Sequence, residues 1–337
     1  MRWGKDYLAY IILFSVFLDV DVAEVRCGNE KKHIYKTLLC NTCSFDCLYC
    51  PNRTSMNKEK VVNKVEDRFF HLLREGKVSG AFLSSTIYKD TETSMEKIIE
   101  AGKSIRKKFA GYIHLKILPG AAFTHIIECS KYADRLSINL EAPENHLPEI
   151  ANEKDFRIDL LRRLRWVSKV KERLRYGFTT QFIVGAADEN DREIMKTAEK
   201  VIRMGAKRVY FSGFFPINGT PLENRKKESE KRILRLYQAE FLIRKYGFAE
   251  KELVYDEDGR LPLNRDPKYI FAKENEDLFP VSIADADYRE LIKVPGIGIK
   301  SAKRIVERRE RKKIESMEEL TKLGVNIRKA KEFIYLS

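Results

Sequence analysis

The chain has 337 residues, of which 43% are hydrophobic and 34% are charged, and its formal net charge is +14. Six cysteines in a chain of this length are too few for a fold held by disulfides, so we expect a globular protein in a reducing compartment. The excess of Lys and Arg favours a polyanionic partner such as nucleic acid, although a generally basic solvated surface would give the same charge.

The first candidate element is an apolar run, Tyr7–Val22, which follows Arg2 and Lys5. The run is too short to span a bilayer comfortably, and Asp19 and Asp21 stand where a signal peptide has small cleavage-site residues. We therefore expect a buried strand or helix here. No later stretch is apolar enough to cross a membrane, so the sequence predicts a cytoplasmic protein without membrane contact.

From Lys36 onward, short β-branched or aromatic runs alternate with longer amphipathic patterns. The expected strands are Lys36–Asn41, Gly80–Thr86, Gly111–Gly120, Arg135–Pro143, Gly177–Gly185 and Arg208–Pro216. The expected helices are Lys58–Gly76, Ser94–Phe109, Thr124–Tyr132, Phe156–Tyr176, Asp191–Met204 and Glu228–Tyr246. Strands that are each followed by a helix predict an α/β fold with a parallel sheet, either open or closed into a partial barrel. Functional residues then collect at the carboxyl ends of the strands.

The alternation ends near Tyr246, and the remaining chain has a different character. Asp256–Pro280 is polar and contains Pro and Asp, which indicates a linker or a segment that wraps around the main domain. A helical pattern then continues to the end. The predicted parts are an N-terminal extension (1–35), a barrel (36–250), a linker or wrapping segment (251–281) and a small all-α module (282–337).

Four of the six cysteines lie in one short segment, of which Cys40 lies at the end of the first expected strand and the other three follow it. Cys43, Cys47 and Cys50 form a C-x3-C-x2-C pattern, and three thiolates can hold three irons of a [4Fe-4S] cluster and leave the fourth iron open. Structural zinc normally takes four ligands, often from two well-separated C-x2-C pairs, whereas here Cys40 and Cys43 lie in the same short segment as Cys47 and Cys50. Cys40 belongs to the strand but could be a fourth ligand, so zinc or a closed cluster is the alternative.

The C-x3-C-x2-C pattern after the first strand of a βα series resembles the signature of the radical SAM superfamily. The resemblance implies a partial (β/α)6 barrel, a [4Fe-4S] cluster on Cys43, Cys47 and Cys50, and S-adenosylmethionine bound at the open iron. It also implies that one electron cleaves the sulfonium and gives methionine and a 5′-deoxyadenosyl radical, which takes hydrogen from the substrate. An electron donor such as ferredoxin or flavodoxin is then expected.

The same resemblance implies contacts to S-adenosylmethionine at the strand ends. Tyr49 fits the aromatic position before the last cysteine. Many members carry a G-G-E-like stretch after the second strand, and here its place is taken by Ser84, Ser85 and Thr86. These residues are expected to contact the methionine amino group through backbone or hydroxyl groups. Because the acid is missing there, Glu141 is expected to bind the amine or the ribose, with a salt-bridged rim carboxylate as the alternative.

Further cofactor contacts are expected on the neighbouring strands. Asn139 ends the fourth strand, and Gly185 lies in a stretch that resembles the superfamily's glycine-containing segment near adenine. His114 and Lys116 alternate on the third strand and therefore share one face. If that face is inward, these two residues contact cofactor or substrate, whereas on the outward face they would meet only solvent or helix caps.

The tail contains the sequence VPGIGIKSA, which predicts a tight turn between two short helices. We expect its glycines, and Gly298 in particular, to need a positive φ. The turn resembles the helix-hairpin-helix motif, which grips a DNA phosphate through backbone N–H groups without reading the base sequence. The expected DNA contacts are Pro295, Gly296, Gly298, Lys300, Ser301, Lys303 and Arg304. A degenerate second hairpin is expected around Gly324, and a protein–protein module or a solvated basic helix is the alternative.

Several separated segments resemble, in order, one family, among them CSFDCLYC, GYIHLKILPGA, IVGAADENDRE and VPGIGIKSAKRIV. This family consists of radical SAM proteins assigned to DNA modification or repair, which carry a helix-hairpin-helix tail and are typically encoded beside a uracil-DNA-glycosylase-like partner. The likeness covers Lys36–Ser337 and implies an enzyme that acts on DNA. The alternatives are radical modification of tRNA or another RNA, and a non-catalytic iron–sulfur sensor of DNA damage.

Overall fold

A computed structural model of the chain describes residues 21–27, 30–53, 61–62 and 64–336. The apolar run Tyr7–Val22 lies outside the described residues except for its last two positions, so the strand or helix expected there stays a prediction. Within the described ranges, no helix combines the length and the apolar character that crossing a bilayer requires.

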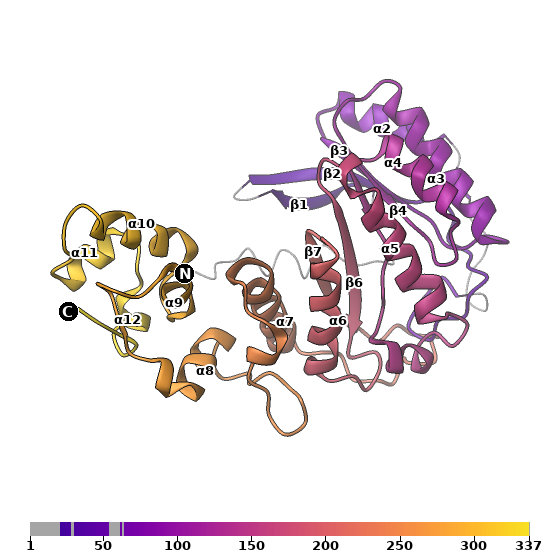
Figure 1. Ribbon diagram of the computed structural model, residues 1–337. Helices are drawn as coiled ribbons and strands as arrows, with labels where there is room; N and C mark the ends of the chain where they lie inside the picture. The colour runs from indigo at the N-terminus through magenta and orange to yellow at the C-terminus, as the bar shows by residue number, and fades with distance from the viewer. Residues whose placement is uncertain (1–20, 28–29, 54–60, 63, 337) are drawn as a thin grey trace. The chain divides into compact units, whose positions relative to one another are not determined.

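Packing divides the described residues into two compact units, whose elements are drawn in Figure 1. The larger unit contains residues 21–189 and 200–233, and the smaller unit contains residues 190–199 and 234–336. Helices α6 (Asp191–Arg203) and α7 (Glu230–Phe241) therefore contribute residues to both units. These units differ from the segments expected from the sequence, whose limits near residues 35, 250 and 281 stay predictions.

The larger unit is built on a seven-stranded sheet in which each strand pairs with the next along the chain. Its strands are β1 (Ala23–Cys27), β2 (Glu30–Leu38), β3 (Gly80–Ser84), β4 (Tyr112–Lys116), β5 (Arg135–Ser137), β6 (Phe178–Val184) and β7 (Arg208–Gly213). β1 is antiparallel to β2, and all later neighbours are parallel. Six parallel strands in chain order confirm the partial (β/α)6 barrel, and β1 is an addition that the sequence did not predict.

Helices connect the parallel strands on the outer side of the curled sheet (Figure 1). They are α2 (Val65–Arg74), α3 (Thr91–Arg106), α4 (Phe123–Tyr132), α5 (Arg162–Lys169) and α6. α3 shows how local sequence sets such a helix, because the Asp90 side chain accepts the Thr93 N–H at 2.7 Å as an N-cap. Its Met95 and Ile98 are completely buried. These apolar residues fix which side of the helix meets the sheet.

Alternation along the strands separates an apolar outer face from a polar inner face. On β4, Leu115 packs against Gly102 of α3, whereas His114 and Lys116 line a cavity on the opposite face. Of the two orientations considered for His114 and Lys116, the structure has the inward one. The inner face of the barrel therefore presents polar side chains, among them His114 and Lys116, to the cavity.

The smaller unit is helical apart from one pair of short strands. It contains η4 (Leu242–Tyr246), α8 (Pro267–Glu274), α9 (Tyr288–Lys293), α10 (Ile299–Arg309), α11 (Met317–Lys322), α12 (Ile327–Ala330) and the parallel pair β8 (Val281–Ser282) and β9 (Ile334–Tyr335). Phe271 of α8 is buried against Phe248 and Phe279, and Phe279 packs on Phe333 near the chain end. The segment 251–281 therefore shares a core with the helical tail.

Candidate active site and nucleic-acid interface

The cysteine loop follows β2 at the carboxyl end of the sheet and is shaped by backbone hydrogen bonds. The Cys43 N–H donates to the Asn52 carbonyl at 3.0 Å, and the Cys50 N–H donates to the Cys47 carbonyl at 3.1 Å. The loop is also tied to the segment after β5, because the Leu48 N–H donates to the carbonyl of residue 150 at 2.9 Å. The three thiols of the motif are thus presented from one folded loop.

These three thiols lie close enough for their charges to interact. Burial raises the pKa of the Cys43 thiol and raises that of Cys50 to about 12, and the neighbouring Cys47 adds to both shifts. A bound metal would reverse these shifts, because the thiolate is the ligating form. In type and position the donor set fits an iron–sulfur cluster. The described His, Cys, Asp and Glu side chains do not form a group of three that could hold a single metal ion.

Cys40 stands apart from the other three cysteines of the segment. Its residue forms an isolated β-bridge with Val61, its side chain is completely buried, and its Sγ donates to the Thr42 carbonyl at 3.7 Å. This surrounding is that of a packed core residue. It supports an open cluster on three ligands over a closed one that also uses Cys40.

Glu141 lies just beyond β5 in a backbone conformation that is rare for a residue with a side chain. Its φ is 65°, in the left-handed region, and the residue is only 8% exposed. Its N–H donates to the Gln181 carbonyl at 3.1 Å, and its carbonyl accepts the Ile183 N–H at 2.7 Å. The pairing with β6 therefore enforces the strained conformation, which is a common feature of functional sites.

Three groups surround the Glu141 carboxylate. Lys154 Nζ lies 3.8 Å from it, the Asn139 amide donates to it at 3.5 Å, and Tyr49 shares a side-chain hydrogen bond with it. Burial opposes the charge of Lys154, but Cys47 and Glu141 outweigh burial and raise its pKa. Burial, followed by the Glu141 charge, raises the pKa of Tyr49 well above its ordinary value. Sequence reasoning missed Lys154, because it lies in an irregular stretch that carries no motif.

The residues after β3 reach the same end of the sheet. The Thr86 hydroxyl donates to the carbonyls of Cys40 and Thr42 at 3.0 and 2.6 Å, so its side chain supports the start of the cysteine loop. The Ser85 hydroxyl is buried and has no hydrogen-bond partner among the described residues. Ser84 lines the inner cavity. Ser84 and Ser85 thus have polar groups available for a ligand, whereas Thr86 is engaged with the loop.

Gly185 follows β6 and has a φ of 86°. A Cβ placed on it would come within 2.5 Å of Glu228 Oε2. Its N–H donates to Glu189 at 2.7 Å, and its carbonyl accepts the Arg225 Nε–H at 2.7 Å. The close approach that the glycine permits is made here by Glu228 of the same chain, and the contact to adenine stays a prediction.

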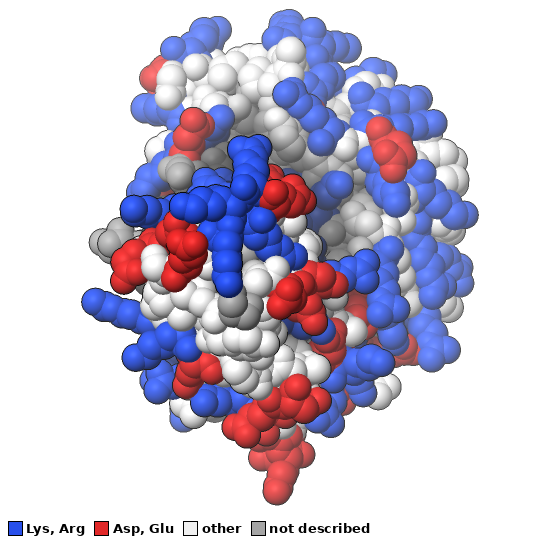
Figure 2. All heavy atoms as spheres, turned by 60° about the vertical axis from the view of Figure 1, so that its left-hand side comes forward, with Lys and Arg blue, Asp and Glu red and all other residues white. Residues whose placement is uncertain are grey.

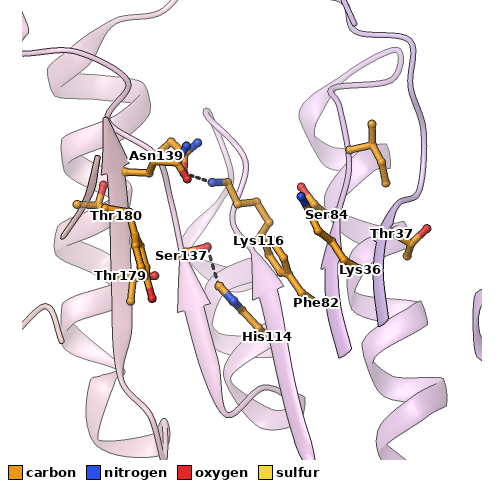
Figure 3. Close-up of a pocket in the computed structure, with 13 residues that line it drawn as sticks. Lys36, Thr37, Phe82, Ser84, His114, Lys116, Ser137, Asn139, Thr179 and Thr180 are labelled. Carbon is orange, nitrogen blue, oxygen red and sulfur yellow. Dashed lines mark hydrogen bonds between the residues drawn. The ribbon is translucent and has the colours of Figure 1, made fainter. Parts of the chain in front are cut away.

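The inner face of the sheet lines a cavity, shown in Figure 3. Its lining residues are Lys36, Thr37, Leu38, Phe82, Ser84, His114, Lys116, Ser137, Asn139, Thr179, Thr180, Gln181 and Tyr210. Lys116 donates to Asn139, and His114 Nε2 lies 2.7 Å from the Ser137 hydroxyl. Burial lowers the pKa of Lys36 and of Lys116 to about 8, and it lowers that of His114 well below its ordinary value. Lys36 belongs to no motif of the sequence, although its position two residues before Leu38 places it on the same strand face.

The hairpin of the tail connects α9 to α10. Gly296 has a φ of 86°, and a Cβ there would come within 2.4 Å of the Asn326 carbonyl. The Asn326 N–H donates to the Gly296 carbonyl at 2.9 Å, so the first hairpin packs on the second, expected around Gly324. Gly298 has a φ of −96° and is the N-cap of α10. The positive φ predicted for Gly298 is therefore wrong, since the left-handed residue of the turn lies two positions earlier, at Gly296.

The side chains at the start of α10 divide into an exposed set and a buried one. Lys300, Lys303 and Arg304 are exposed, whereas Pro295 is buried. Ser301 is also buried, and its hydroxyl donates to the Gly324 carbonyl at 2.8 Å, which leaves only its backbone for the predicted DNA contact. Figure 2 shows Lys and Arg gathered on the face that it brings forward, with Asp and Glu beside them. The hairpin thus presents cations next to a helix N-terminus.

Two family models match the chain. Residues 37–201 match the model of the Radical SAM superfamily, and residues 280–331 match that of the helix-hairpin-helix motif. None of the curated proteins compared with this chain is a significant match.

Solved structures share part of the fold of this chain. Methylornithine synthase (PylB) superposes with a TM-score of 0.51 and 11% identity, over 71% of this chain and 66% of its own. HydG, a maturase of the [FeFe]-hydrogenase, superposes with a TM-score of 0.50 and 12% identity, over 62% of this chain and 49% of its own. At such identities the likeness shows the fold alone. The chain spans about two thirds of the length of methylornithine synthase and about half of the length of HydG.

Proposed function

Because this chain contains a radical SAM domain and is an enzyme of that superfamily, we propose that it repairs or modifies DNA by radical chemistry. A [4Fe-4S] cluster and S-adenosylmethionine are the cofactors of such a domain, and when bound they supply an electron and a source of a carbon radical. We propose DNA as the substrate because the helix-hairpin-helix turn at Gly296 belongs to the same chain as this domain. Its helix N-terminus and exposed cations suit a backbone phosphate.

We assign the cluster to Cys43, Cys47 and Cys50, which share one loop, and leave Cys40 to the core. The amino group of S-adenosylmethionine is assigned to Glu141, supported by the enforced left-handed backbone that directs its carboxylate. Asn139, Tyr49 and Lys154 hold that carboxylate in place through the contacts described above. Ser84, Ser85 and Lys116 complete the expected cofactor contacts, and Gly185 is kept as the contact to adenine.

The DNA contacts are assigned to the hairpin of the tail. Backbone N–H groups beside Gly296 and Gly298, together with Lys300, Lys303 and Arg304, bind phosphate and carry no information about base sequence. Binding should therefore be nearly independent of sequence. Because a base inside the duplex cannot reach a barrel interior, a damaged, mismatched or unpaired site should be the preferred target, where extrusion costs least.

Three further assignments rest on the resemblance to the DNA modification or repair family. A uracil-DNA-glycosylase-like protein is a candidate partner, and ferredoxin or flavodoxin is a candidate electron donor. The location is cytoplasmic, since a thiolate-ligated cluster and free cysteines suit a reducing compartment.

The decisive experiment is anaerobic reconstitution followed by reaction with DNA and RNA substrates. Dithionite-reduced protein should convert S-adenosylmethionine to 5′-deoxyadenosine, slowly without substrate and faster with it. Mass spectrometry of duplex DNA and of tRNA should find an altered nucleotide in the DNA, and duplex DNA should displace tRNA from the protein. No 5′-deoxyadenosine at full cluster loading would favour the non-catalytic sensor, and alteration of tRNA alone would favour the RNA enzyme.

A further inference from the structure

Gln181 has a polar group that the proposed cofactor contacts leave unexplained. The residue lies on β6, is only 3% exposed and lines the barrel cavity. Its Nε2 is buried without a hydrogen-bond partner among the described residues. Buried amide donors are normally paired, so an unpaired one in a cavity wall indicates that an acceptor is supplied from outside the chain.

The same cavity contains two lysines, and for one of them, Lys116, the nearby Glu141 carboxylate favours the charged form. Lys36 comes from β2 and Lys116 from β4, and Figure 3 shows both side chains extending into the space between the strands, Lys116 toward Asn139. No Asp or Glu is among the described residues that line the cavity. Burial makes both ammonium groups harder to charge, and its effect is to bring the pKa of each to about 8. An anion would stabilise these charges where solvent does not.

Lys36 lies deeper in the barrel than the residues assigned to S-adenosylmethionine. In the register of β2 and β3, Lys36 pairs with Phe82, whereas Leu38 pairs with Ser84 at the carboxyl end. Two residues along a strand correspond to about 6–7 Å. The backbone of Lys36 therefore lies further from the carboxyl end of the sheet than that of Ser84.

We propose that the barrel cavity binds a phosphate group of the substrate, with Lys36 and Gln181 as its donors. The proposal rests on the proposed function, in which a nucleotide unit enters the barrel and brings its own phosphate. Phosphate oxygens accept hydrogen bonds from an ammonium and an amide at once, and charge-assisted bonds of this kind are the stronger ones. The carboxylate of S-adenosylmethionine offers similar acceptors, so the test must separate the two sources.

The test titrates each of the four deoxynucleoside 5′-monophosphates, and the matching deoxynucleosides, into full-length cluster-loaded protein by calorimetry. We expect each monophosphate to bind at least about tenfold more tightly than its nucleoside, because only the monophosphate makes the charge-assisted bonds. Lys36→Met should remove most of this preference, and Gln181→Leu should reduce it. Lys103→Met, which replaces an exposed lysine of α3 outside the cavity, should leave the preference unchanged.

S-adenosylmethionine is titrated into the same variants, whose iron content and circular dichroism must match the wild type. A Lys36→Met protein that keeps the monophosphate preference overturns the proposal. A Lys36→Met protein that keeps the preference for monophosphates but binds S-adenosylmethionine more weakly also overturns the proposal, because Lys36 is then a cofactor contact. If the proposed function is wrong, the protein neither binds nor alters DNA. If the protein alters DNA but shows no preference for the monophosphates, only the assignment of the cavity is wrong.

Discussion

The four cysteines between residues 40 and 50 differ in how they are packed. Cys40 is enclosed in a β-bridge with Val61, whereas the three cysteines of the motif lie on the loop that follows. The spacing C-x3-C-x2-C predicted this division, because Cys40 precedes the loop on the strand pattern. By contrast, Lys154 and Gln181 could not be predicted, because their roles depend on which segments the fold brings beside them.

Replacing one cysteine at a time tests the ligand set. Cys43→Ala, Cys47→Ala and Cys50→Ala should each lose nearly all cluster iron, because a three-ligand site has no spare thiolate. Cys40→Ala should keep most of the iron and the brown absorbance, though it leaves a small cavity that costs roughly 1–2 kcal/mol of stability. Iron and sulfide analysis checks both. Equal loss of iron with Cys40→Ala would establish a closed cluster.

Glu141→Gln tests the assigned amine contact. The substitution keeps the shape and removes the charge, so the dissociation constant of S-adenosylmethionine should rise about tenfold, the effect of about 1.4 kcal/mol from one charge-assisted bond. Cluster iron should stay at the wild-type level. The matched control is Glu153→Gln, whose carboxylate accepts the Asp46 N–H at 2.7 Å. If both variants bind S-adenosylmethionine equally well, Glu141 is only a structural carboxylate.

Among the elements, the hairpin between α9 and α10 shows where a sequence motif is informative and where it is not. The turn and its two helices followed from the VPGIG sequence, but the sequence could not tell which glycine is left-handed. That depends on the second hairpin, whose Asn326 carbonyl occupies the space beside Gly296. The same limit explains why α8 was expected as part of a linker, since its Phe271 packs on Phe248 and the following Phe279 packs on Phe333.

Gly296→Val and Gly298→Val should therefore differ. At Gly296 the valine meets a positive φ and a backbone oxygen at 2.4 Å, so we expect a loss of at least about 2 kcal/mol of stability and at least a tenfold loss of DNA affinity. At Gly298 the φ of −96° is open to valine, and the stability should change by less than about 1 kcal/mol. Thermal unfolding and fluorescence anisotropy measure both. Equal effects would contradict this description of the turn.

Lys268 of α8 contacts the backbone of the same hairpin. It is 7% exposed, and its Nζ donates to the Ile297 carbonyl at 2.7 Å. Burial lowers its pKa from 10.5 to about 7, so between these pH values the unfolded chain binds more protons at this site than the folded one. Stability contributed by Lys268 must then rise as pH rises from about 7 toward 10.5.

The corresponding experiment compares the melting temperatures of wild type and Lys268→Met across this pH range. The wild type should gain on the variant by at least about 3 °C as pH rises, because the methionine does not titrate. Lys331→Met, at an exposed position of the tail, should show no such trend. A constant difference between wild type and Lys268→Met would mean that this lysine stays charged in the folded tail.

For the molecule as a whole, we expect the tail to bind DNA and the barrel to cleave S-adenosylmethionine. Replacing Lys300, Lys303 and Arg304 together by Gln should weaken DNA binding at least tenfold and reduce the slope of log K against log salt by about 2–3. Cleavage of S-adenosylmethionine without substrate should be unchanged. The matched control is the exposed triple Lys103→Gln, Lys107→Gln and Lys108→Gln in the larger unit. Equal weakening by both triples would show that net charge, not the hairpin, attracts DNA.

This charge variant is a sharper test than deletion of the tail from Ser282. Such a deletion would remove Phe333 and uncover Phe279 and Phe271, which pack in one aromatic group with it. The truncated protein could then fail through aggregation rather than through loss of a DNA contact. The order of the parallel strands, by comparison, followed directly from the sequence, because each βα unit is local in the chain and pairs with the next.

The smaller unit combines residues that are synthesised early with residues that are synthesised late. Residues 190–199 are made before β7, yet their partners in this unit belong to residues 234–336. The Arg192 N–H donates to the Gly259 carbonyl at 3.0 Å, and the Asp191 carboxylate accepts the Leu261 N–H at 2.8 Å. The first turns of α6 must therefore wait, without these bonds, while the last strand of the barrel is translated. A nascent chain stalled before residue 259 would therefore carry all the strands of the barrel and an α6 that lacks these two hydrogen bonds.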